Sequence, residues 1–211
     1  MAIDYKKQDK ELYQPGTEPS VVDVPEMTFI RVDGQGDPND PEGEYATAVE
    51  LLYALSYAIK MMPRSGETPE GYFEYVVPPL DGYWWVDNEP DSDFRDKSKY
   101  RWTAMLRQPE FVTPELFEKA RAIVAKKKPG LDLSKARLVN FREDLCVQCM
   151  HIGPFSTEAE TIRKMMDFTG TNGLTEDFSD TRRHHEIYLS DPRKGDPAKM
   201  KTILRHPVKR V

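Results

Sequence analysis

Three stretches of the chain carry patterns typical of helices. In residues 44–62 the apolar side chains are spaced three and four positions apart, and Pro63 ends the pattern. Residues 113–128 begin with Thr113, a good N-cap residue, followed by a proline and an acid in the first turn. Both stretches are therefore predicted to be helices.

The third predicted helix covers residues 157–169. Thr157 and Glu160 have the spacing of a capping box, in which each side chain bonds the backbone N–H of the other. Gly170 and Gly173 mark the end of the helix.

The remaining hydrophobic stretches are short and bounded by turn residues, which is typical of strands. Residues 136–155 are predicted to form a strand pair with a hairpin at residues 142–144. The sequence DPRKGD, from Asp191, has the composition of a turn. The other predicted strands cover residues 26–33, 73–79, 82–88, 100–109, 184–189 and 200–207.

The order of these elements repeats along the chain. Two modules, at about residues 21–110 and 136–208, each run strand, helix, strand, strand, and the helix at 113–128 links them. The pattern predicts an α+β fold with pseudo-twofold symmetry, in which antiparallel sheets carry helices on one face. Residues 1–20 are a polar leader, and residues 21–208 form a single domain. We expect a central ligand cleft between the modules.

Composition excludes several classes of function. No apolar run reaches the ~20 residues that cross a bilayer, and the N-terminus lacks the apolar segment of a secretory signal. We therefore expect a cytoplasmic protein without a membrane partner. The net charge of -6 argues against direct binding to nucleic acid. No motif calls for a cofactor or a metal, and homo-oligomerisation is left open.

The stretch HHEIYLS, residues 184–190, has a glutamate at its centre. Because a strand points alternate side chains to opposite faces, His184, Glu186 and Tyr188 share one face and His185 lies on the other. A carboxylate removed from water costs several kcal/mol unless a partner compensates. Glu186 therefore either lies on the wet face of an edge strand or has a partner in a ligand site.

Aromatic residues are concentrated in the first module. Trp84, Trp85 and Trp102 lie within nineteen residues on adjacent predicted strands, which is more than a core of this size needs. They suggest either an aromatic ligand surface or a well-packed core. Trp84 and Trp85 must face opposite ways. Tyr53, Tyr57 and Tyr75 are further candidates for the wall of a pocket.

Cysteine and histidine give weaker signals. Cys146 and Cys149 form a C-x-x-C, but a strand would turn the two thiols to opposite faces, so ordinary buried thiols are favoured over a redox pair. His151 is either an inward polar group of the site or a hydrogen-bonded histidine at a strand end.

Several stretches resemble a known family, the GyrI-like small-molecule-binding domain. They are LLYALSYAIKM, VVPPLDGYWW, RWTAMLRQPEFVT, MHIGPF and above all HHEIYLSDPRK with KMKTILRHPV. The resemblance covers about residues 20–208 and implies a duplicated strand-helix-strand-strand fold. In regulators of this family a glutamate matching Glu186 meets cationic aromatic drugs. The chain lacks their helix-turn-helix segment, which puts a direct role in transcription in doubt.

Stand-alone members of the family resemble this chain more closely and are hydrolases of duocarmycin-like and yatakemycin-like cyclopropane toxins. The resemblance implies that Glu186 takes a proton from water while Tyr188, or a tyrosine of the first helix, hydrogen-bonds the substrate carbonyl. Trp84, Trp85, Trp102, Tyr53, Tyr57, Tyr75, His151 and His184 are then the candidate ligand-binding residues. The alternatives are a non-catalytic drug-binding or sequestering module and a protein-binding inhibitor of a topoisomerase.

Overall fold

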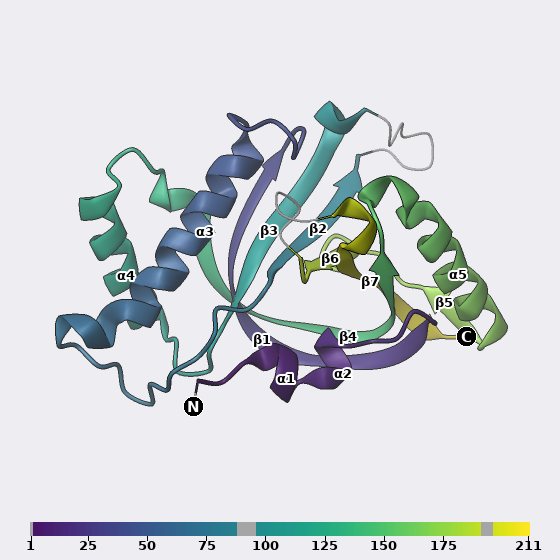
Figure 1. Ribbon diagram of the computed structural model, residues 1–211, viewed down its shortest axis with the longest axis horizontal. Coiled ribbons are helices and arrows are strands. Elements are labelled where there is room, and N and C mark those ends of the chain that lie inside the picture. Colours follow the sequence, from purple (N-terminus) through teal and green to yellow (C-terminus); the bar gives the residue numbers. More distant parts are fainter. Residues whose placement is uncertain (1, 88–95, 191–195) are drawn as a thin grey trace. The chain divides into compact units, whose positions relative to one another are not determined.

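The computed structural model describes residues 2–87, 96–190 and 196–211 (Figure 1). The chain divides into two compact units. Unit 1 comprises Met1–Asp4, Met27–Pro78 and Trp84–Phe141, and unit 2 comprises Tyr5–Glu26, Pro79–Tyr83 and Arg142–Val211.

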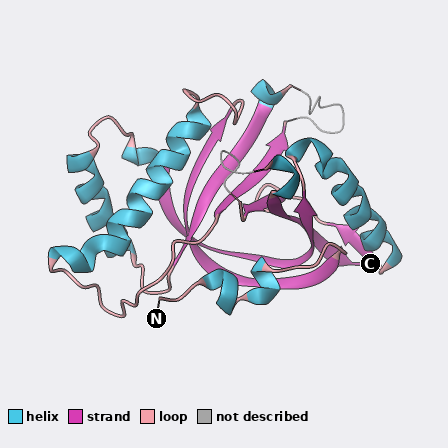
Figure 2. Ribbon diagram, in the orientation of Figure 1, coloured by secondary structure: helices cyan, strands magenta, loops and turns pink. Residues whose placement is uncertain are grey.

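The chain contains both helices and strands, which Figure 2 distinguishes by colour. The helices are α1 (Tyr5–Gln8), α2 (Lys10–Tyr13), α3 (Glu44–Met61), α4 (Pro114–Lys127) and α5 (Glu158–Thr171). The strands are β1 (Ser20–Gln35), β2 (Leu80–Val86), β3 (Tyr100–Gln108), β4 (Ala136–Ile152), β5 (Leu174–Glu176), β6 (His184–Tyr188) and β7 (Lys201–Arg210). Short 3-10 helices cover Met62–Ser65, Lys97–Lys99, Leu133–Lys135, Phe155–Thr157 and Pro197–Lys199.

Hydrogen bonds join the strands of the described residues in the order β4-β1-β3-β2-β6-β7-β5, and β4 also pairs with β7. This additional pairing closes the ladder of strands on itself. The pairings β1–β3, β4–β7, β5–β7 and β6–β7 are antiparallel. The predicted mixture of helices with antiparallel sheet is confirmed. The pseudo-twofold relation between two modules stays a prediction.

In unit 1, α3 packs against α4 and β3 (Figure 1). The helix buries Leu51, Leu52, Leu55 and Ile59, which recur at helical spacing as the sequence indicates. The hydroxyl of Thr113 accepts a hydrogen bond from the Leu116 N–H at 3.2 Å and so caps α4. The helices predicted at residues 44–62 and 113–128 are confirmed.

A close approach between neighbouring strands fixes one residue of unit 1 as glycine. The antiparallel register of β1 and β3 places Gly34 opposite Trp102. A Cβ atom on Gly34 would overlap the Trp102 indole, which is 1% exposed. The missing side chain of Gly34 therefore makes room for the largest side chain of β3.

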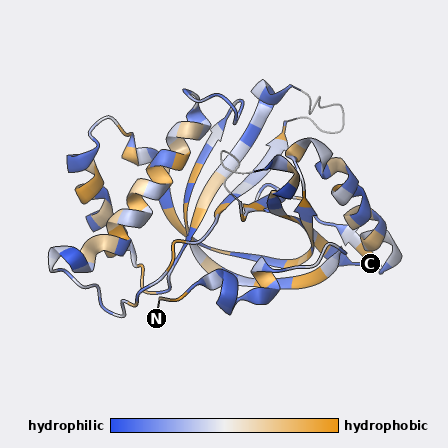
Figure 3. Ribbon diagram, viewed as in Figure 1, coloured by the Kyte–Doolittle hydropathy of each residue, from blue (hydrophilic) through white to orange (hydrophobic). Residues whose placement is uncertain are grey.

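In unit 2, β7 pairs with β4, β5 and β6, and α5 packs on β5 and β7. Figure 3 shows α5 as largely hydrophilic with interspersed hydrophobic positions, the pattern of a helix with one buried face. Met165 is buried whereas Met166 is exposed. Beneath the helix lies a core of Val147, Cys149, Met165, Leu174, Leu204 and Val208.

The predicted polar leader contains structure of its own. It forms α1 and α2, in which Tyr5, Leu12 and Tyr13 are buried. The backbone carbonyl of Glu11 accepts a hydrogen bond from the Gln148 side chain at 2.7 Å, and both residues belong to unit 2. These helices are therefore an integral part of unit 2.

One predicted strand and one predicted hairpin are wrong. Residues 73–79 form no strand beyond a single parallel bridge between Tyr75 and Ile3, since Pro78 and Pro79 have no N–H to donate to a ladder. The hairpin predicted at residues 142–144 is the second error.

The stretch predicted as two strands is the single strand β4. Asp144 has a φ of 61°, and the Arg142 guanidinium bonds its carboxylate at 2.5 Å. The turn-like backbone thus occurs at one residue, and the strand continues past it. Between these two residues Glu143 points into unit 2, where Arg205 and His185 bind its carboxylate. That buried ion pair keeps the segment in the sheet.

The predicted capping box of the third helix is also wrong, although the helix itself is confirmed as α5. The Thr157 side chain makes no cap hydrogen bond to the helix. Its hydroxyl donates instead to the Pro154 carbonyl at 2.8 Å and lies 3.3 Å from His151 Nε2. Glu160 is exposed. The local hydrogen bonds to the preceding turn displace the capping geometry.

The remaining predicted strands are confirmed as β1, β2, β3, β6 and β7, with shifts at their ends. The end of the strand predicted at 82–88 and most of the turn that begins at Asp191 lie outside the described residues. No helix within the described ranges has the length and apolar content that crossing a membrane requires.

Candidate active site

The candidate site is built on β6, whose side chains alternate between two environments. His185 and Ile187 are each 2% exposed, whereas His184, Glu186 and Tyr188 keep part of their surface in contact with solvent. Glu186 is therefore on a face where water can reach a carboxylate that is still largely shielded. Its side chain is 13% exposed.

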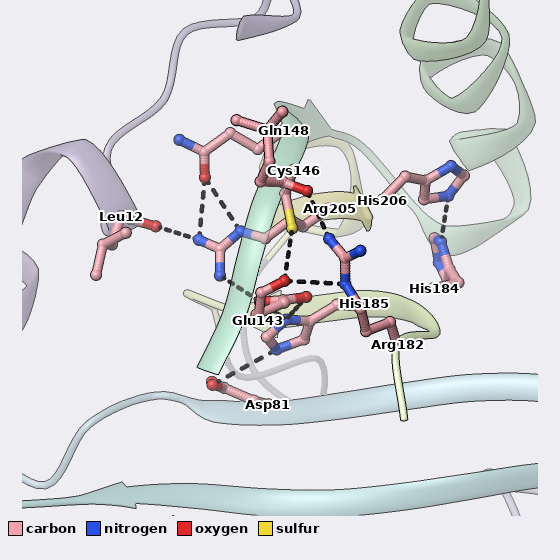
Figure 4. Close-up of polar contacts among 11 residues, drawn as sticks. Leu12, Asp81, Glu143, Cys146, Gln148, Arg182, His184, His185, Arg205 and His206 are labelled. Carbon is pink, nitrogen blue, oxygen red and sulfur yellow. Dashed lines mark hydrogen bonds and ion pairs between the residues drawn. The ribbon is translucent and has the colours of Figure 1, made fainter. Parts of the chain in front are cut away.

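A chain of polar contacts starts at Glu186 and crosses three strands. Glu186 Oε1 lies 3.2 Å from His184 Nε2 on the same strand. His184 Nδ1 lies 2.8 Å from Nε2 of His206 on β7, as Figure 4 shows. His206 Nδ1 in turn lies 2.9 Å from Oε1 of Glu176 on β5. Two carboxylates thus flank two imidazoles that contact each other directly.

A second carboxyl group, that of Glu158 at the start of α5, is affected by the charge of Glu186. Burial, followed by the charge of Glu186, raises the pKa of Glu158 to about 9. Glu158 is 9% exposed, and its Oε1 has no hydrogen-bond partner among the described residues. At neutral pH the site therefore contains a protonated carboxylic acid whose protonation depends on the charge of Glu186.

Tyr188 lies on the same face as Glu186, two residues further along β6. Its ring meets the ring of Phe155 edge to face, with centroids 5.9 Å apart. Phe155 is 39% exposed. The pair places a phenol and an accessible aromatic ring beside the carboxyl groups.

His151 has both ring nitrogens engaged. Nδ1 lies 2.9 Å from the Thr161 hydroxyl, and Nε2 lies 3.1 Å from the Pro154 carbonyl and 3.3 Å from the Thr157 hydroxyl. The side chain is buried and joins the end of β4 to the start of α5. This geometry is that of a hydrogen-bonded strand-end histidine, one of the two readings of the sequence.

On the opposite face of β6, His185 enters a buried ionic network (Figure 4). His185 Nδ1 lies 3.0 Å from Glu143 Oε1, and Nε2 lies 3.6 Å from Asp81 Oδ2. Arg205 donates to Glu143 Oε2 at 3.2 Å, and also to the Gln148 side chain and the Leu12 carbonyl. All four ionisable groups are at most 2% exposed.

Charge pairing decides the protonation of Glu143 and His185, whereas burial raises the pKa of Asp81. Burial alone would raise the pKa of Glu143, but the charges of His185 and Arg205 and their hydrogen bonds outweigh it and hold the pKa at about 2. Burial lowers the pKa of His185, and the neighbouring carboxylates Glu143 and Asp81 more than reverse that effect. Each buried charge has an opposite partner, as a structural network requires.

The predicted tryptophans belong to unit 1 and differ in burial. Trp84 and Trp85 are half-buried, whereas Trp102 is fully buried. The Tyr45 ring packs against both Trp84 and Trp102, with centroid distances of 5.2 and 5.1 Å. Trp102 therefore belongs to an aromatic cluster of the core.

The predicted tyrosines are also in unit 1. Tyr53 and Tyr57 stack along α3 with ring centroids 6.4 Å apart, and Tyr57 is 46% exposed. Tyr75 is 1% exposed and packs against Phe73 and Phe111. Burial raises the pKa of Tyr75 further above its ordinary value, so its hydroxyl stays protonated.

The ten predicted site residues thus fall in both units. Glu186, Tyr188, His184 and His151 lie on one side of unit 2, and the six aromatic candidates lie in unit 1. Sequence reasoning missed Glu158, His206 and Glu176. These residues are distant from Glu186 along the chain, so no local pattern connects them with it. Pairing of the predicted strands 184–189 and 200–207 could have suggested His206.

The two thiols are unsuited to nucleophilic chemistry. Cys146 and Cys149 are free and completely buried. Burial raises the pKa of both, that of Cys149 to about 11, so neither is a thiolate at neutral pH.

The family model of the GyrI-like small molecule binding domain matches residues 17–209. The chain belongs to the GyrI-like family. This match confirms the resemblance found in the sequence, and its span covers the whole candidate site. A search of curated protein sequences returned no match.

Solved structures of similar chains support the same assignment. A crystal structure described as a hydrolase from Listeria innocua is 48% identical, with a TM-score of 0.88, and the match covers 98% of this GyrI-like chain and 100% of the other. A second Listeria innocua structure, of an uncharacterized conserved protein, is 51% identical with a TM-score of 0.92 and the same coverage. The EcmrR C-terminal domain shares the fold at 12% identity, with a TM-score of 0.53 over 92% of this chain and 98% of that domain.

Proposed function

We propose that this GyrI-like protein binds hydrophobic aromatic small molecules and hydrolyses reactive cyclopropane-bearing genotoxins of the duocarmycin and yatakemycin type, which would protect the cell. The observation that carries the proposal is the pairing of a shielded, solvent-reachable Glu186 with a protonated Glu158 on one face of unit 2. The description of a 48% identical protein as a hydrolase supports turnover.

The reaction needs one base and one proton donor. Glu186 takes a proton from a water molecule as the water oxygen bonds the cyclopropane CH₂ carbon. The strained carbon–carbon bond breaks, and its electron pair moves through the ring to the dienone oxygen. That oxygen takes up a proton and becomes a phenol, so the substrate gains one water in total. Ring strain and aromatisation supply the driving force.

Two neighbouring groups suit the developing phenolate. Tyr188 is one of the two donors that the family resemblance implies for the substrate carbonyl, the other being a tyrosine of the first helix. Glu158, which keeps its proton at neutral pH, is a second acid on the same face. Phe155, packed on Tyr188, offers an apolar surface for a planar substrate. Ligand contacts by Trp84, Trp85, Trp102, Tyr53, Tyr57 and Tyr75 stay a prediction.

The test is a comparison of wild type with Glu186→Gln on a cyclopropane-bearing duocarmycin analogue. The variant should still bind a neutral aromatic ligand, followed by tryptophan fluorescence, but should lose hydrolysis by at least ~100-fold, the contribution of a general base. Glu160→Gln on α5 is the matched control, because this glutamate is exposed. Equal hydrolysis rates for wild type and Glu186→Gln would remove Glu186 from the mechanism.

Binding without turnover is the second candidate. A carboxylate next to an aromatic pair also suits a cationic aromatic ligand, since a cation over a ring gains ~0.5–2 kcal/mol. In that case the ligand would be recovered unchanged after saturating one site, and Glu186→Gln would weaken binding of cationic ligands only.

A further inference from the structure

The contacts from Glu186 to Glu176 form one continuous chain across β6, β7 and β5. The successive distances are 3.2 Å from Glu186 to His184, 2.8 Å from His184 to His206, and 2.9 Å from His206 to Glu176. Each contact is within hydrogen-bond reach, so the His184–His206 and His206–Glu176 contacts each need one proton and one acceptor, and the Glu186–His184 contact has room for one proton. The proton positions along the chain are therefore coupled.

Glu176 sets the proton at the far end. An ionised carboxylate only accepts hydrogen bonds, so His206 Nδ1 must donate to it. Burial lowers the pKa of His206 and, with a smaller contribution from His184, outweighs the opposing hydrogen bond and charge of Glu176, so this imidazole is neutral. A neutral imidazole has a single N–H. Nε2 of His206 is therefore an acceptor.

The acceptor on His206 determines the tautomer of His184. Because His206 Nε2 can only accept, His184 Nδ1 must carry the hydrogen that lies between the two rings. In neutral His184 the other nitrogen, Nε2, then has a lone pair aimed at Glu186 Oε1. One proton fits between these two atoms, held by either of them.

We propose that Glu176 and His206 are positioning residues that fix the tautomer of His184, so that His184 Nε2 shares with Glu186 the proton that Glu186 takes from water. The proton leaves water as the carbon–oxygen bond forms, rests between Oε1 and Nε2, and returns to solvent or product after each turnover. This role in turnover rests on the proposed function, whereas the tautomers can be measured in the free protein.

The first test is nitrogen-15 NMR of the histidine side chains in the whole protein without ligand. The proposal expects hydrogen on Nδ1 of His206, none on its Nε2, and hydrogen on Nδ1 of His184. His151 and His185 serve as internal references because each has different partners. A hydrogen on His206 Nε2 would overturn the proposal, whatever the protein does to any substrate.

The second test removes the acceptor at the far end. Glu176→Ala should lower kcat by about tenfold and leave KM unchanged, since an outer residue that orients a working group contributes about 10–100-fold. Glu176→Gln keeps an amide oxygen that can accept from His206 and should recover most of the lost rate. The Glu176 side chain is 32% exposed, so both substitutions are compatible with folding.

The two tests separate the failure of this inference from the failure of the proposed function. If the NMR tautomers are as expected but the analogue is not hydrolysed, Glu176 and His206 still fix the tautomer of His184, and the proposed substrate is wrong. If hydrolysis occurs but Glu176→Ala and Glu176→Gln are equally active, or equally impaired, the acceptor at position 176 does not orient the histidines and the inference is overturned.

Discussion

Burial gives Glu158 a protonation state that an exposed glutamate would not have. Its pKa of about 9 in the folded protein exceeds the usual 4.5, so between these values the folded state holds a proton that the unfolded chain has lost. The free energy of unfolding therefore falls as pH rises through this window, by up to about 1.4 kcal/mol per pH unit.

Glu158→Gln, which resembles the protonated acid in shape, removes that dependence. We expect the variant to gain stability relative to wild type as pH rises from 5 to 8, measured by urea unfolding at several pH values. Glu160→Gln provides the comparison at an exposed site of the same helix. A stability difference that stays constant with pH would contradict the assigned protonation of Glu158.

The residues of the candidate site differ in whether the sequence alone predicts their position. The alternation in HHEIYLS correctly separates His184 and Glu186 from His185, because strand geometry alone fixes the faces. Glu158, His206 and Glu176 come from α5, β7 and β5, and only their packing in three dimensions brings them to Glu186. No local pattern encodes such contacts.

Among the secondary-structure elements, the helices are predicted correctly from periodicity and caps, whereas the turn-like residues of β4 mislead the prediction. Local sequence predicts a hairpin at residues 142–144, yet the buried ion pair of Glu143 with Arg205 holds the segment in a continuous strand. Arg205, the partner of Glu143, is sixty-two positions away along the chain. Tertiary contacts thus override local turn propensity.

The close approach of Gly34 to Trp102 in the β1–β3 pair can be tested by substitution. Gly34→Ala should destabilise the protein by about 1–3 kcal/mol, the usual cost of overpacking, because the new methyl group meets the buried Trp102 indole. Gly130→Ala is the control, since a Cβ there meets no atom within 4 Å. Equal denaturation midpoints for the two variants would show that β3 adjusts without cost.

For the whole molecule, the ionic network around Glu143 should be a main contributor to pH-dependent stability. The Glu143 pKa of about 2 lies below its usual 4.5, so its contribution is present above pH 4.5 and is lost as pH falls toward 2. Glu143→Gln should cost about 3–5 kcal/mol near pH 6, because it leaves Arg205 buried without its carboxylate.

The difference between wild type and Glu143→Gln should shrink as pH falls from 4.5 to 2. The comparison is Glu50→Gln, whose partner Lys128 lies on the surface and whose removal should cost at most about 1 kcal/mol. Chemical denaturation of the three proteins at pH 6 and pH 3 measures both effects. A cost for Glu143→Gln no larger than that for Glu50→Gln would contradict a stabilising role of the network.

Multiple turnover of a cyclopropane substrate can be measured directly. Purified protein is incubated with a tenfold excess of a cyclopropane-bearing duocarmycin analogue, and mass spectrometry follows the addition of water, with a protein-free sample as the blank. We expect a water adduct that grows well past one equivalent per protein chain. An adduct that grows no faster than in the blank, while tryptophan fluorescence still reports stoichiometric binding, would contradict hydrolysis and leave a binding protein.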